Sequence, residues 1–303
     1  MQSVGLVGLG LMGQAFAERL LAAGYPVLGT DIDATKREQL MALGGRTTAG
    51  LQEIAETCDL IILAVFNTEQ VESVTETDLL PILPKGARPI VLCTSTCDPD
   101  RIAALAARLD GSGLRFLETP VSGTSVQVRR GAGVGLIAGD LAATLDAQAV
   151  LDVLFPKNFH VGRIGDAGRT KLAVNLVLGL NRLALAEGLA FAERVGLDLQ
   201  AFFPVLRESA AYSQVMDTKG PKMVRSDFSP EGRARQTLKD AHLMIEQADK
   251  AGQPLPALAV HADVLEACVR NGQGDLDNSV IIEELRRRRR DACPANRDTM
   301  HPI

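Results

Sequence analysis

The chain has 303 residues, which is long for a single domain and suits two. Its 32 basic and 37 acidic side chains give a formal net charge of -5, so the sequence offers no broad cationic surface to bind nucleic acid or anionic lipid. The five cysteines form no CxxC pair and no metal-ligand spacing with the four histidines, which argues against a disulfide framework or a zinc module. We therefore expect a small-molecule partner, reduced thiols and no metal.

The start of the chain favours a cytoplasmic protein. Met1 leads directly into Val4-Gly5-Leu6-Val7, with no basic flank and no cleavage site, so no signal peptide is expected. No apolar run approaches the roughly 20 residues that span a bilayer, and a membrane role is not expected.

The first half of the chain alternates short β-rich runs with segments whose apolar residues recur at helical spacing. The expected strands are Ser3–Val7, Pro26–Thr30, Leu60–Val65, Pro89–Leu92 and Arg115–Glu118. The expected helices are Met12–Ala23, Thr35–Leu43, Leu51–Thr57, Thr68–Thr77 and Pro99–Leu109. This alternation predicts a Rossmann-type, doubly wound parallel sheet covered by helices.

After Gly123 the pattern changes. The expected elements are strands at Gly133–Ala138 and Phe159–Val161, a helix at Thr144–Leu154, and then helices to Leu285 with turns at Asp227–Gly232 and Gly252–Pro256. The run from Gly168 to Val195 is apolar around most of its circumference, which predicts a helix buried on nearly all sides. The fold class is therefore α/β followed by an all-α domain.

We place the domain boundary near Gly162. Residues 1–162 form the expected dinucleotide-binding domain, 163–290 the all-α substrate and dimerisation domain, and 291–303 a flexible tail. The arginine run Arg286–Arg290 is interpreted as a solvated helix end. The apolar segment Ala173–Ala192 suggests burial by a second subunit, as in a homodimer or homotetramer, although a partner within the chain would serve as well.

The motif Gly8-Leu9-Gly10-Leu11-Met12-Gly13 directly follows the first expected strand and opens a helix. In this context GxGxxG predicts a dinucleotide site, because the glycines permit a tight turn and close approach of a pyrophosphate to a helix N-terminus. Asp31 follows the second strand, where an acidic residue accepts hydrogen bonds from the adenosine ribose. Since Ile32 supplies no positive charge for a 2′-phosphate, NAD is favoured over NADP; the alternative is that Asp31 only caps a turn.

Lys171 and Asn175 are four residues apart and therefore lie on one face of the long apolar helix. A buried ammonium without a partner is costly, so this lysine is either a functional group or a side chain that reaches solvent. Ser122 beside Gly123 could present several hydrogen-bond donors to one anion, or could form an ordinary turn.

Five ordered motifs make the chain resemble the β-hydroxyacid dehydrogenase family, which includes 3-hydroxyisobutyrate dehydrogenase, tartronate semialdehyde reductase and L-threonate dehydrogenase. The motifs are Gly8–Gly13 with its Met12, Ser95-Thr96 before Pro99, Thr119-Pro120-Val121-Ser122-Gly123, Lys171 with Asn175, and Leu238-Lys239-Asp240. The resemblance covers nearly the whole chain.

The resemblance implies a role for each matching residue. Thr96 and Lys239 would contact the cofactor, while Ser122, Gly123 and Thr124 would hold the substrate carboxylate and Asn175 would contact the substrate. Neutral Lys171 would take the hydroxyl proton of a small 3-hydroxy acid while NAD accepts hydride from the same carbon.

Three positions depart from the family pattern and leave the substrate open. Thr124 and Ala167 stand where many members have glycine, and Phe66-Asn67 replaces the usual Leu-Pro. The alternatives are a non-catalytic dinucleotide-binding or scaffold protein of the same fold, an imine reductase, which usually lacks the lysine, or 6-phosphogluconate dehydrogenase, which has a longer chain.

Overall fold

The computed structural model describes residues 3–288. They form two compact units, one made of the residues up to Leu178 together with Lys239–Leu255, and the other of Gly179–Leu238 together with the residues from Pro256 onward. This division runs through the long helix and leaves Lys171 and Asn175 in the same unit as the sheet. The functional boundary near Gly162 stays a prediction.

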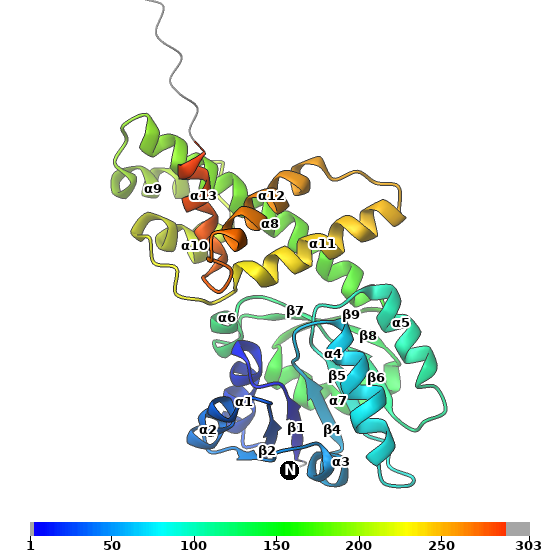
Figure 1. Cartoon of the computed structure of the whole chain (residues 1–303). Coiled ribbons are helices and arrows are strands. Elements are labelled where there is room, and N and C mark those ends of the chain that lie inside the picture. The colour runs from blue at the N-terminus through cyan, green and yellow to red at the C-terminus, as the bar shows by residue number, and fades with distance from the viewer. Residues whose placement is uncertain (1–2, 289–303) are drawn as a thin grey trace, which may run out of the picture. The chain divides into compact units, whose positions relative to one another are not determined.

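The first unit is built on a mixed sheet (Figure 1). Within residues 3–288 nine strands follow the order β3-β2-β1-β4-β5-β6-β8-β7, with β9 paired to β8. They are β1 (Val4–Val7), β2 (Val27–Thr30), β3 (Arg46–Thr47), β4 (Leu60–Leu63), β5 (Ile90–Cys93), β6 (Arg115–Glu118), β7 (Val121–Ser122), β8 (Val134–Gly139) and β9 (Lys157–Gly162). Strands β1 to β6 are parallel, as expected for a doubly wound fold.

Helices follow most of these strands in chain order. They are α1 (Leu11–Ala22), α2 (Ala34–Ala42), α3 (Gln52–Thr57), α4 (Thr68–Glu72), α5 (Pro99–Arg108), α6 (Ser125–Arg129), α7 (Leu141–Leu154) and α8 (Asp166–Arg194). Aspartates begin several of them; the Asp33 carboxylate, for example, accepts the Thr35 N–H at 2.9 Å. The helix expected over Thr68–Thr77 is instead α4 followed by a π-helix, η1 (Ser73–Leu79), and a 3-10 turn, η2 (Leu80–Ile82).

Alternation along the central strands separates two cores. Leu60 and Ile62 of β4 pack with Phe16 of α1 on one face, whereas Ile61 of β4 packs with Ile54 of α3 on the other. Because a strand buried on both faces is apolar throughout, these segments read as continuous apolar runs in the sequence.

Strand β8 departs from the expected all-parallel sheet. It runs antiparallel to β6 and to β7, which are one strand interrupted at Thr119-Pro120. Proline cannot donate to a strand ladder, which explains the break, while the Pro120 carbonyl still accepts the Leu136 N–H at 3.0 Å. The interruption places a buried turn directly beside the sheet.

The second unit is helical in the described residues, as expected, and includes most of the remaining helices. These are α9 (Leu199–Glu208), α10 (Gln214–Arg225), α11 (Ala234–Lys250), α12 (Pro256–Arg270), η3 (Asn278–Val280) and α13 (Ile281–Arg287). Only the first residues of α11, up to Leu238, belong to this unit.

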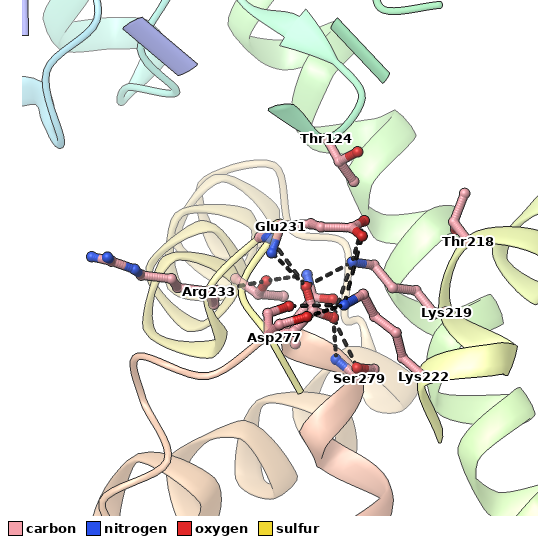
Figure 2. A network of polar contacts seen from close by, with 12 residues as sticks. Thr124, Thr218, Lys219, Lys222, Glu231, Arg233, Asp277 and Ser279 are labelled. Carbon is pink, nitrogen blue, oxygen red and sulfur yellow. Dashed lines mark hydrogen bonds and ion pairs between the residues drawn. The ribbon is translucent and has the colours of Figure 1, made fainter. Parts of the chain in front are cut away.

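A buried ion pair connects α10 to the turn before η3 (Figure 2). Asp277 is fully buried, and its carboxylate accepts hydrogen bonds from Lys219 Nζ at 2.8 and 3.0 Å. The N–H groups of Glu231, Gly232 and Ser279 donate to the same carboxylate. Burial disfavours the charged carboxylate, but Lys219 and these donors outweigh it and lower the pKa of Asp277.

The prediction that the long helix is buried on nearly all sides is wrong for the described chain. Val177 is 60% and Phe191 68% exposed on α8, and Val174 and Leu178 are also partly exposed. The helix has an apolar face that nothing in residues 3–288 covers.

The expectation that no run approaches a membrane-spanning length also needs correction. By length and composition alone, α8 qualifies as a candidate span, a test that core helices of soluble proteins also pass. Two charged side chains of α8, Lys171 and Arg182, are buried within the protein, which is unusual for a lipid-facing helix.

The arginine run is paired where the structure describes it. Arg286 contacts Glu193 and Glu283, and Arg288 contacts Asp263. Arg289, Arg290, the expected tail and Cys293 lie outside the described residues. The other four cysteines are buried free thiols.

Candidate active site

The Gly8–Gly13 turn has the shape that a pyrophosphate requires. Gly8 has a φ of +93°, and a Cβ there would lie 2.5 Å from the Ala64 carbonyl oxygen; a Cβ on Gly13 would lie 2.0 Å from the Gly8 oxygen. Gly10 begins α1 without a side-chain cap, and a Cβ at this position would meet no atom within 4 Å. The helix N-terminus is therefore open to an anion.

Asp31 lies at the carboxyl end of β2, beside this turn. Its Oδ2 accepts the Leu9 N–H at 2.7 Å, and its Oδ1 accepts the Asp33 N–H at 2.9 Å. Lys36 Nζ lies 3.4 Å from Oδ1, and the Arg37 guanidinium donates to the Asp31 carbonyl. Two cations of α2, Lys36 and Arg37, thus contact Asp31. The neighbouring Ile32 side chain is fully exposed.

The turn after β6 contains the expected carboxylate-binding residues. Gly123 has a φ of +144°, which disfavours any side chain there. The Thr124 N–H donates to Gln127 Oε1 at 2.8 Å, and the Thr124 hydroxyl oxygen accepts the Gln127 N–H at 3.2 Å. This capping box starts α6 and leaves Thr124 only its hydroxyl proton as a further donor.

Lys171 is buried on α8, and its Nζ donates to the Val121 carbonyl within the same turn. Burial lowers the pKa of Lys171 to about 8, because an ammonium loses its hydration there. The negative charge of Asp240 acts in the opposite direction, and the positive charge of Lys239 adds to the lowering. The side chain can therefore exist as a neutral amine near neutral pH.

The predicted residues of the Leu238-Lys239-Asp240 motif lie around Asn175 and Thr96. Asn175 Nδ2 donates to Asp240 Oδ2 at 3.3 Å, and Lys239 Nζ lies 3.2 Å from Asp240 Oδ1. Lys239 also donates to the Thr96 carbonyl after β5, and its Nζ lies 5.8 Å from the centroid of the Phe66 ring. Asp240 thus joins Asn175 to Lys239, and Lys239 in turn contacts Thr96.

Sequence reasoning assigned no role to Asp240, Lys36 or Glu118. Asp240 stood inside a recognised motif, and Lys36 lies one helical turn beyond the Asp31-Ile32-Asp33 segment. Glu118 is 2% exposed at the end of β6, and its carboxylate accepts the N–H groups of Gly165 and Gly168. The sequence signal for Glu118 was its acidic side chain at the end of a strand that was expected to be buried.

Two family models together match most of the chain. Residues 3–162 match the NAD binding domain of 6-phosphogluconate dehydrogenase, and residues 165–285 match a domain described as NAD-binding of NADP-dependent 3-hydroxyisobutyrate dehydrogenase. The first matched range includes Asp31, and the second includes Lys171.

Individual relatives are similar over most of their length. The chain is 28% identical to glyoxylate/succinic semialdehyde reductase 2 of Arabidopsis thaliana, over 94% of this chain and 79% of the relative. It is 28% identical to L-threonate dehydrogenase of Cupriavidus necator, over 93% and 95%.

A solved structure shows the same architecture. The 3-hydroxyisobutyrate dehydrogenase from Salmonella typhimurium is 27% identical and superposes with a TM-score of 0.86, covering 93% of this chain and 99% of that one. Together with the glycine turn, these matches show that the chain belongs to the β-hydroxyacid dehydrogenase family of nicotinamide-dependent oxidoreductases.

Proposed function

We propose that the protein oxidises the hydroxyl carbon of a small 3-hydroxy acid, such as a 3-hydroxyisobutyrate-, glycerate- or threonate-like compound, with NAD as the cofactor. The observation that carries this proposal is the buried Lys171, whose Nζ contacts the turn that contains Ser122 and Gly123. A proton-transfer group and an anion-binding turn thereby lie side by side. A nicotinamide bound at this end of the sheet would supply the hydride acceptor.

Lys171 acts as the general base in oxidation and as the general acid in reduction. With a pKa of about 8, it exchanges a proton near neutral pH, which an ordinary lysine does not do efficiently. Asp240 holds the Asn175 amide, so that this side chain can orient the substrate hydroxyl toward Lys171.

Ser122 and Gly123 hold the substrate carboxylate through the serine hydroxyl and backbone N–H groups. The Thr124 hydroxyl can add one donor, since the Thr124 N–H is already used by Gln127. A carboxylate fits because charge-assisted hydrogen bonds of this kind are about twice as strong as neutral ones.

The Gly8–Gly13 turn would hold the pyrophosphate of the cofactor, and Asp31 would hold its ribose. Thr96 and Lys239 lie at the carboxyl end of β5 and would contact the nicotinamide side. The Asp31 carboxylate favours NAD, because it would repel a 2′-phosphate. Lys36 and Arg37 moderate this preference, since they already lie at Asp31.

Turnover with a defined panel tests the proposal. Purified protein is assayed for reduction of NAD and of NADP with 3-hydroxyisobutyrate, glycerate, threonate and a 3-hydroxy sulfonate. We expect activity with at least one carboxylate and little with the sulfonate, whose three oxygens need more donors. Tight NAD binding without turnover of any acid would instead support a non-catalytic dinucleotide-binding protein. Four buried free thiols favour a reducing compartment, such as the cytoplasm, as the location of the protein.

The exposed apolar face of α8 supports a homodimer or homotetramer, in which a second copy covers Val177 and Phe191. Sedimentation analysis of the native chain and of Val177→Asp tests this assembly. A native chain that sediments as a monomer at micromolar concentration would contradict it.

A further inference from the structure

Glu118, the last residue of β6, joins the segment that leads to Ser122 and Gly123 to α8, the helix that carries Lys171. Its Oε2 accepts the Gly165 N–H at 2.7 Å, and its Oε1 accepts the Gly168 N–H at 2.9 Å. These donors lie just before and within the first turn of α8, where helix N–H groups have no partner inside the helix. The helix dipole further favours a negative charge at this end.

The sequence makes room for this contact. A Cβ on Gly168 would lie 2.6 Å from Glu118 Oε1, so any larger residue there would displace the carboxylate. Gly165 has a φ of +100°, and a Cβ there would lie 3.1 Å from the Pro99 carbonyl oxygen. The glycines before Lys171 therefore let the backbone reach Glu118.

The segment after β6 and the first turn of α8 are joined by a second hydrogen bond, three residues further along in each segment. Val121 follows Glu118 by three residues and accepts a hydrogen bond from Lys171, which follows Gly168 by three residues. The carboxylate contact and the Lys171 contact therefore fix the same register between the turn and α8. A shift of the helix end at Glu118 would move Lys171 relative to Ser122 and Gly123.

We propose that Glu118 is a positioning residue, which holds the first turn of α8 in the register that places Lys171 opposite the substrate-carboxylate turn. This inference rests on the proposed function, because it takes Lys171 as the acid/base group. Because Glu118 is 2% exposed and both its oxygens accept N–H groups at the start of α8, it acts through this helix.

The contact is strongest with ionised Glu118, since protonation turns one of the two acceptor oxygens into a hydroxyl, which accepts an N–H group more weakly. Burial raises the pKa of Glu118 to about 7, although the backbone donors and the charge of Arg169 oppose this rise. The titratable groups that face it are Arg169 on α8 and the Cys93 thiol on β5, whose own pKa is raised. The register is therefore held more firmly above pH 7 than below it.

Glu118→Gln tests the proposal, because it keeps the side-chain size but replaces one acceptor oxygen by a donor. We expect kcat for 3-hydroxy acid oxidation to fall about 10- to 100-fold, the scale of a catalytic group displaced by about 1 Å, while the Kd for NAD stays unchanged. The pH profile should lose its step near 7 and keep the step near 8. Gly168→Ala disrupts the same contact from the side of α8, and it should cause the same change in kcat and in the pH profile.

Asp166→Asn is the matched control. Asp166 also lies in the first turn of α8, but its side chain is 35% exposed; it accepts the Arg163 N–H and pairs with Arg169, not with the N–H groups that Glu118 holds. This variant should keep the native kcat. Native kcat and profile in Glu118→Gln would overturn the proposal.

Nuclear magnetic resonance of glycine-labelled protein tests the contact without turnover. The amide signals of Gly165 and Gly168 should shift with pH around a midpoint near 7 in the native chain and stay constant in Glu118→Gln. Amide signals that do not respond to pH between 5.5 and 8.5 would overturn the proposal. If they respond but no acid is turned over, the Glu118 contact stands and the proposed function fails.

Discussion

Replacement of Lys171 tests the proposed proton transfer most directly. The shift of its pKa from 10.5 to about 8 raises the share of neutral amine at pH 7 about 300-fold, a difference of roughly 3 kcal/mol. The kcat/KM for oxidation should therefore rise with pH and level off above about 8. Lys171→Ala should lower kcat about 10²- to 10⁴-fold and remove the rise in rate near pH 8. Initial rates of NAD reduction across pH 6 to 10 measure both effects.

Lys171→Arg should be nearly as inactive as Lys171→Ala, because a guanidinium does not release its proton in this pH range. Lys157→Ala removes an exposed lysine of β9 and serves as the control with unchanged kcat. If either Lys171 variant kept native turnover and the native pH profile, Lys171 would be a structural residue and the mechanism would be wrong.

The neighbours of Lys171 give a second check on the same pKa. The charge of Lys239 lowers the pKa of Lys171, so Lys239→Gln should move the upper midpoint of the pH profile to higher pH. Asp240 raises the pKa of Lys171, so Asp240→Asn should move that midpoint to lower pH. Shifts in the reverse directions would mean that the midpoint belongs to another group.

Three further predictions concern the cofactor, the substrate and the fold. The native chain should prefer NAD over NADP about tenfold in kcat/KM, and Asp31→Ser should shrink this preference, because it removes the carboxylate that pairs with Lys36; equal use of both cofactors by the native chain would exclude Asp31 from the ribose site. Ser122→Ala should weaken binding of the acid by about 1.5–3 kcal/mol in its Kd, and the amide of the best substrate should lose a similar amount. Asp277→Asn should lower the free energy of unfolding in urea by about 3–5 kcal/mol, because it leaves Lys219 buried without a full charge partner, whereas the exposed Asp275→Asn should change it by less than about 1 kcal/mol.

The sequence predicted the sheet well where local and tertiary preferences agree. Strands such as Leu60–Leu63 are apolar runs between turn residues, and their buried environment leaves few alternatives. The two-residue β3 and β7 could not be predicted, since they form only by pairing with a neighbour. The reversal of β8 is also a tertiary property, because an apolar run does not encode the direction in which it pairs.

The candidate site was predictable where a motif fixes local geometry, and less so where residues distant in the chain meet. The Gly8–Gly13 turn follows from its glycines, and the placement of Lys171 and Asn175 on one helix face follows from their spacing. The contact of Glu118 with Gly165 and Gly168 spans about 50 residues and has no local signature. Similarly, Lys36 is not adjacent to Asp31 in the sequence, and it reaches the Asp31 carboxylate only because α2 begins between the two residues.

The two titrating groups at the start of α8 should make the pH dependence differ between the two reaction directions. Reduction requires protonated Lys171, which exists below about 8, and ionised Glu118, which exists above about 7. The reduction rate should therefore form a bell with its maximum between these values. Oxidation requires neutral Lys171 and ionised Glu118, so its rate should rise in two steps and not fall. In Glu118→Gln the acid limb of the reduction bell should disappear while the alkaline limb stays, which is measured as NADH oxidation with the matching 3-oxo acid. An acid limb that persists in this variant would have to arise from the substrate or from a group other than Glu118.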